Sequence, residues 1–235
     1  MSSAALTQAQ RYRALNASLK RLRREAFARI QKAFQESGIE FSVRDRGVGI
    51  PAEARVLLFL GRLHPMKRVS ALIDAFGRTR ARGCEEGLKL VIIGDEISKL
   101  PALRRAVHSH KLHKHVRFLG YLEDDTLAIL YRLASVFVFP SLYEGFGLPP
   151  LEAMASGTPV VTSNVSSLPE VAGDAAVLVD PYDVDAIADG MRRVIADPAL
   201  AADLRRRGLA RAREFSWARS VERTLEVYRS VCASR

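Results

Sequence analysis

Six short apolar runs, separated by segments long enough to form helices, constrain the fold of this chain more than any other feature. The runs are Val56–Leu60, Leu88–Ile93, Val116–Leu119, Val136–Phe139, Val160–Val161 and Ala176–Val179. The helices expected between and after them are Lys67–Arg80, Leu100–Leu112, Asp125–Leu133, Leu148–Ala155, Val184–Ile195, Pro198–Arg213 and Trp217–Val231. Apolar runs of this kind are typical of strands buried on both faces, so the pattern predicts a doubly wound α/β domain with a parallel sheet.

A glycine-rich turn with two carboxylates follows the run that ends at Phe139. Glu144 and Glu152 stand eight positions apart, and Gly145 and Gly147 lie between them. A strand, a glycine turn and a helix N-terminus together direct unpaired N–H groups and a positive dipole end at an anion. Carboxylates would repel a bare phosphate, but they accept hydrogen bonds from hydroxyl groups. Phosphate together with several hydroxyls indicates a nucleotide sugar.

This segment resembles the Glu-x7-Glu motif of family-4 retaining glycosyltransferases, which have the two-domain GT-B fold. Three further segments match that family in order and spacing: the strand, Gly-Arg-Leu turn and lysine of Val56–Lys67, then Ala155–Val161, then Leu168–Glu170. Several spaced motifs are more specific than any one of them. The resemblance covers the chain from Val56 onward and implies a Rossmann-like domain, the C-terminal, donor-binding half of such an enzyme.

The resemblance also implies roles for individual residues. Arg62 and Lys67 would neutralise the departing nucleoside diphosphate without a metal or other cofactor. Glu144 would face the transferred sugar and stabilise positive charge at its anomeric carbon. The donor-binding residues implied are Glu152, which would accept hydrogen bonds from the ribose, with Gly61, Gly145, Phe146, Gly147 and Leu148. One position departs from the family, since Arg68 stands where glycine usually follows the lysine.

Residues 1–50 differ in character from the predicted domain at 51–235. The net charge of the chain is +10, and this first segment carries ten basic and four acidic residues, a surplus of six. Tyr12, Leu15, Leu19 and Leu22 recur at helical spacing, which predicts a long basic amphipathic helix. It can pack on the domain, attach to an anionic membrane surface or bind nucleic acid. Nucleic acid is the weakest of the three, since no recognised motif focuses the charge.

An acceptor-binding domain of the GT-B kind does not fit into these first fifty residues, because one strand-helix-strand unit alone takes about thirty. The chain is therefore expected to be the donor half alone. The acceptor wall would then come from a partner chain or from self-association, or the chain is a truncated one. A non-catalytic module that binds a nucleotide sugar or a partner is the alternative.

Four histidines, His108, His110, His113 and His115, form a cluster, but their spacing matches no helical metal-ligand pair or zinc-finger pattern. We expect a solvated surface there and no metal. His64, between Arg62 and Lys67, could touch the ligand. Only two cysteines, Cys84 and Cys232, occur, and no signal peptide or membrane span is recognisable. A cytoplasmic location is expected, either free or at the inner membrane surface.

Overall fold

The computed structural model describes residues 55–83, 87–94 and 100–233. In these residues six parallel strands form one sheet in the order β3-β2-β1-β4-β5-β6. They are β1 (Arg55–Leu60), β2 (Leu88–Ile93), β3 (Val116–Leu119), β4 (Val136–Phe139), β5 (Val160–Ser163) and β6 (Ala176–Val179). The predicted doubly wound α/β architecture is confirmed, and each predicted strand is present.

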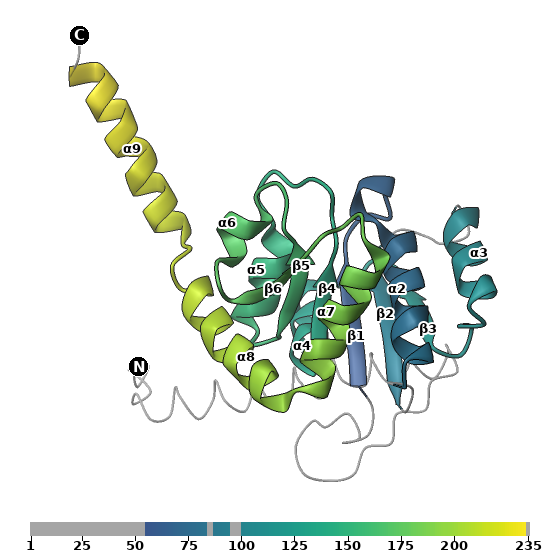
Figure 1. Ribbon diagram of the computed structural model, residues 1–235. Coiled ribbons are helices and arrows are strands. Elements are labelled where there is room, and N and C mark those ends of the chain that lie inside the picture. Colours follow the sequence, from purple (N-terminus) through teal and green to yellow (C-terminus); the bar gives the residue numbers. More distant parts are fainter. Residues whose placement is uncertain (1–54, 84–86, 95–99, 234–235) are drawn as a thin grey trace, which may run out of the picture.

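Helices cover both faces of the sheet (Figure 1). They are α2 (Val69–Ala81), α3 (Pro101–Ser109), α4 (Asp124–Leu133), α5 (Leu148–Ala155), α6 (Leu168–Ala172), α7 (Val184–Ala196), α8 (Pro198–Ala212) and α9 (Trp217–Ala233), with a short 3-10 helix η1 (Pro65–Lys67). On one face α2 packs against α7, and on the other α5 packs against α4 and α8. Helix α9 projects from the domain beyond α8 (Figure 1).

The core consists of the strands and the helix sides that face them. All four residues of β4 are fully buried, as the apolar run predicts for a central strand. Phe137 and Phe139 of this strand lie with their ring centroids 5.9 Å apart, and Phe59 of β1 lies 5.8 Å from Phe139. These rings form a closely packed aromatic cluster beneath the loops that leave β1 and β4 at their carboxyl ends.

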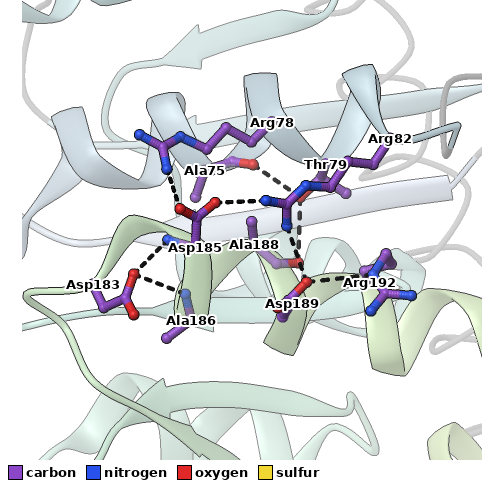
Figure 2. A network of polar contacts seen from close by, with 10 residues as sticks. All are labelled: Ala75, Arg78, Thr79, Arg82, Asp183, Asp185, Ala186, Ala188, Asp189 and Arg192. Atoms are coloured by element: carbon purple, nitrogen blue, oxygen red, sulfur yellow. Dashed lines mark hydrogen bonds and ion pairs between the residues drawn. The ribbon is translucent and has the colours of Figure 1, made fainter.

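Ion pairs join α2 to α7 on the outer surface (Figure 2). Asp185 contacts both Arg78 and Arg82, and Arg82 also reaches Asp189 at 3.1 Å. The hydrogen bond from Arg78 holds the pKa of the Asp185 carboxyl below its usual value. Asp183 begins α7, where its carboxylate accepts from the backbone N–H groups of two following residues. The network therefore adds polar contacts between two helices of the same layer.

Three details differ from the sequence predictions. The helix expected from Lys67 begins at Val69, because Arg68 has a left-handed backbone with φ of 56° and separates it from η1. The helix expected to reach Leu112 ends at Ser109, and Lys111 has φ of 54°. The short helix α6 was not predicted. The predicted basic helix within residues 1–50 lies outside the described residues, and no described helix is long and apolar enough to cross a membrane.

Candidate functional site

The loops after β1 and β4 meet at the carboxyl edge of the sheet. These strands are neighbours in the sheet, but the chain continues from β1 toward β2 and from β4 toward β5, in opposite directions. Ligands of open α/β sheets bind in the crevice at such a switch point. Two hydrogen bonds to the Met66 carbonyl join the loops, one from the Leu142 N–H at 2.8 Å and one from the Ser141 hydroxyl at 3.3 Å. The two sequence motifs around Arg62 and Glu144 thus belong to one edge.

Lys67 and Glu144 form an ion pair across these two loops. The Lys67 side chain is 21% exposed and that of Glu144 is 13% exposed, so the pair is partly withdrawn from water. The Lys67 ammonium also lies 5.3 Å from the centroid of the Phe139 ring. Sequence reasoning assigned the two residues to different parts of a ligand, and the structure shows that they also contact each other.

Arg62 is the second residue after β1 and is exposed. Its guanidinium makes no hydrogen bond or ion pair with any other residue that the structure describes. The turn before it is held closely by the loop after β2, since a Cβ at Gly94 would lie 2.3 Å from the Gly61 carbonyl oxygen. Sequence reasoning did not include Gly94 in the site. Like Gly61, Gly94 lies directly after a buried strand, and this is the sequence feature that could have indicated its role in the site.

The glycine turn has backbone N–H groups without partners among the described residues. Gly147 is the N-cap of α5 with φ of 111°, a backbone conformation that favours glycine. A Cβ there would lie 2.9 Å from a methyl carbon of Leu168, whereas a Cβ at Gly145 would meet open space. In the described part of the chain, nothing accepts from the N–H groups of residues 145–148. Because Pro149 and Pro150 follow without N–H groups, Leu148 provides the free donor in the first turn of the helix.

Two serines before α6 hold this turn, and sequence reasoning missed them. The Ser166 hydroxyl accepts from the Glu144 N–H at 3.1 Å and donates to the Glu144 carbonyl at 2.9 Å. The Ser167 hydroxyl lies 2.7 Å from the Phe146 carbonyl. Phe146 itself is 44% exposed and packs edge-on against Phe215 at 5.8 Å. The only sequence indication was that both serines precede Leu168, where the third family segment begins.

Glu152 lies on α5 and has a different partner from Glu144. Its Oε2 atom accepts a hydrogen bond of 3.0 Å from the hydroxyl of Tyr131, which is 2% exposed. Burial, followed by the charge of Glu152, raises the pKa of Tyr131, so the phenol stays protonated and donates. Glu152 is exposed to solvent otherwise. One carboxylate oxygen is thus fixed by Tyr131 while the side chain stays accessible.

Two side chains near Lys67, those of Arg68 and His64, are placed for local structure. Arg68 donates from Nε to the Pro181 carbonyl at 3.1 Å, and its guanidinium lies 5.9 Å from the Tyr182 ring centroid. The left-handed backbone of Arg68 explains why glycine suits this position. His64 caps η1, since its Nδ1 accepts from the Met66 N–H at 3.3 Å.

The histidine cluster does not join this site. The His108 and His113 rings lie 5.4 Å apart, and His110 pairs with Asp74 of α2 at 3.1 Å. Among the residues described, no group of three or more His, Cys, Asp or Glu side chains is arranged to hold a metal ion.

Comparison with known proteins identifies the family. The sequence pattern of the family described as "Glycosyl transferases group 1" matches residues 43–211, which is most of the chain. This chain belongs to the group 1 glycosyltransferase family. The resemblance drawn from the sequence motifs is thereby confirmed at the level of this family.

Individual proteins similar to this chain come from the same family. O-antigen chain mannosyltransferase B of Escherichia coli is 40% identical over 73% of this chain and 45% of its own length, so the match spans less than half of that relative. Sucrose-phosphate synthase of Thermosynechococcus elongatus has 32% identity and a TM-score of 0.68 over 79% of this chain and 47% of its own. The C-terminal domain of a group 1 glycosyl transferase from Francisella tularensis has 28% identity and a TM-score of 0.61 over 68% of this chain and 85% of its own.

Proposed function

We propose that this chain binds a nucleoside-diphosphate sugar and presents it for retaining transfer to a hydroxyl acceptor. The observation that carries the proposal is the partly buried Lys67–Glu144 pair, which holds a cation and a carboxylate side by side at the switch point of the sheet. The adjacent glycine turn offers N–H groups with no partner among the described residues. A cation, free N–H donors and carboxylates in one crevice match the phosphates and hydroxyls of a nucleotide sugar.

The diphosphate is assigned to Arg62 and Lys67. The free guanidinium of Arg62 offers a planar set of donors for phosphate oxygens, and Lys67 adds a second positive charge. Two cations can balance a departing diphosphate, and we therefore propose that no metal ion takes part. The N–H groups of residues 145–148 would hold further phosphate or sugar oxygens.

The two carboxylates are assigned to the sugar and the ribose. Glu144 would stabilise the positive charge that develops at the anomeric carbon in the transition state. Glu152 would accept from the ribose hydroxyls with the oxygen that Tyr131 does not occupy. In the transfer step, the bond between the anomeric carbon and the diphosphate oxygen breaks. A bond from the acceptor oxygen forms on the same face of the sugar, and the acceptor proton passes to the departing diphosphate.

The chemical class of the sugar is proposed from the relatives. A protein named as a mannosyltransferase is 40% identical to this chain over 176 residues. We therefore propose a hexose, with mannose as the first choice. Loops that differ between relatives can change this preference, so a panel of donors is the direct test.

Transfer needs a second wall for the crevice. The acceptor oxygen must be held about 3 to 3.5 Å from the anomeric carbon with water excluded. We propose that this wall comes from a further domain or a partner molecule, as the greater length of the relatives suggests. The basic segment at residues 1–50 would bring the domain to an anionic membrane surface. A non-catalytic nucleotide-sugar-binding module is the alternative.

Calorimetric titration with GDP, UDP and ADP tests the binding proposal. At least one should bind, and Arg62→Ala and Lys67→Ala should each weaken it by about 1.5 to 3 kcal/mol, or roughly ten- to 150-fold. Arg223→Ala removes an exposed arginine from α9 as a matched control and should leave affinity unchanged. The phosphate assignment is wrong if both site variants bind as tightly as the parent.

A transfer assay separates catalysis from binding alone. The purified chain should bind a nucleotide sugar but transfer little of it, and a supplied acceptor domain should restore transfer. Efficient transfer to a simple acceptor by the isolated chain would contradict the need for a second wall. No transfer with any acceptor domain, despite tight binding, would favour the non-catalytic alternative.

A further inference from the structure

A hollow lies between α3 and β3, the edge strand of the sheet. Its volume is about 900 Å³, within the usual range for small-molecule sites. None of the described residues that line it belongs to the loops after β1 or β4. It is therefore separate from the residues assigned to the nucleotide sugar.

The walls of this hollow have two chemical characters. Arg104, Arg105, His108 and His113 contribute basic groups, and Val107, Val116 and Phe118 contribute apolar surface. Of the described residues that line the hollow, none is acidic. Both arginines are exposed, and neither makes an ion pair with another described residue. Two guanidinium groups beside apolar surface offer donors that an anion can use.

The surroundings strengthen the positive charge. Between Leu100 and Leu122 the sequence contains five arginines or lysines, four histidines and no acidic residue. Burial, then the charges of Arg117 and Arg80, lower the pKa of Lys89 on the neighbouring strand. Within this cluster, His110 is held against α2 by Asp74. Such an excess of one sign attracts a ligand of the opposite sign.

We propose that the α3–β3 hollow binds an amphiphilic phosphate, meaning a phosphate group that carries an apolar chain. The two arginines take the phosphate oxygens in their planar donor arrays. Val107, Val116 and Phe118 contact the apolar chain. Inorganic phosphate would use only the first part of the site, so the apolar chain should add affinity by removing apolar surface from water. The ligand can be a free small molecule or a membrane lipid, because both present the same chemistry.

The test compares three proteins: the parent, Arg104→Ala/Arg105→Ala, and the control Arg193→Ala/Arg223→Ala. The control removes two exposed arginines that have no ion-pair partner among the described residues, so the loss of net charge is equal. Calorimetry with monomeric dihexanoyl phosphatidic acid and with inorganic phosphate tests a free ligand. Sedimentation with phosphatidylcholine vesicles, with and without phosphatidic acid, tests a membrane source.

The soluble phosphatidic acid should bind at least about tenfold more tightly than inorganic phosphate. The Arg104/Arg105 variant should lose at least about tenfold in affinity, and the control should stay close to the parent. If only the vesicles bind, and the Arg104/Arg105 variant loses this binding while the control keeps it, the ligand is a membrane lipid. The proposal is overturned if neither probe binds, if both variants lose affinity equally, or if inorganic phosphate binds as well as the amphiphile. Unchanged nucleotide binding and unfolding temperature confirm that the variant is folded and separate this proposal from the proposed function.

Discussion

Replacing Glu144 by glutamine should tighten the binding of a nucleoside diphosphate. In the structure the Lys67 ammonium is paired with the Glu144 carboxylate. A diphosphate that uses Lys67 must compete with that carboxylate and also come close to its negative charge. Glutamine keeps the shape of the side chain but removes the competing charge, so both effects favour the diphosphate.

The magnitude follows from the burial of the pair. Two unit charges about 4 Å apart attract by about 4 kcal/mol at an effective dielectric constant of about 20. Desolvation and the ordering of both side chains offset most of this, and fully exposed pairs retain about 0 to 1 kcal/mol. With side chains 21% and 13% exposed, the pair lies between the surface and the interior. We expect a net effect of roughly 1 to 1.4 kcal/mol, which is about a five- to tenfold gain in affinity.

The competition is tested by a double-mutant cycle at Glu144 and Lys67, in which calorimetry measures the affinity of each variant for the tightest-binding diphosphate. The Glu144→Gln gain should be larger in the parent background than when Lys67 is methionine, where only the charge repulsion is removed. Glu222→Gln on α9 removes an exposed carboxylate and should not change affinity. If Glu144→Gln binds the diphosphate no more tightly than the parent does, competition for the ammonium is refuted. If the gain in affinity is the same when Lys67 is methionine, the effect is charge repulsion alone. Transfer in the completed enzyme should fall with this variant although binding improves.

Three other predictions test the framework. Gly94→Ala should lower the free energy of unfolding by about 2 kcal/mol or more and abolish nucleotide binding, because its Cβ would meet the main chain at Gly61. The Cβ of the control Gly120→Ala enters open space, so chemical denaturation should show little change in stability. Asp185→Asn should lower the unfolding temperature at neutral pH. Because Arg78 lowers the pKa of the Asp185 carboxyl, this carboxyl stabilises the fold above its ordinary pKa of 3.8. The stabilisation should be lost as the pH falls through the folded-state pKa, so the unfolding temperatures of parent and variant should converge there. EDTA should leave calorimetric nucleotide affinity unchanged, and strict dependence on a divalent ion would contradict the assignment of the diphosphate to two cations.

The strands could be predicted from sequence because continuous apolar runs have few alternative structures. The run at Val136–Phe139 became β4 with the same bounds. The break at Arg68 could not be predicted, since arginine rarely has positive φ and the contacts that accompany it come from a loop more than a hundred residues away. Local propensity does not report such distant contacts.

The site was only partly predictable for the same reason. The motifs indicated Lys67 and Glu144 separately, but their contact depends on β1 and β4 being neighbours in the sheet. Ser166 and Ser167 support the glycine turn with hydroxyl groups, which have no periodicity that a sequence pattern could show. The role of Tyr131 likewise appears only when α4 and α5 are packed together.

A crystal structure of the chain with the tightest-binding nucleoside diphosphate would show where the phosphates lie. They should lie beside the loops after β1 and β4, with oxygens within hydrogen-bond distance of Arg62 and Lys67 and with the Lys67–Glu144 pair opened or shared. A nucleotide bound elsewhere, such as in the hollow beside α3, with that pair intact would contradict this placement.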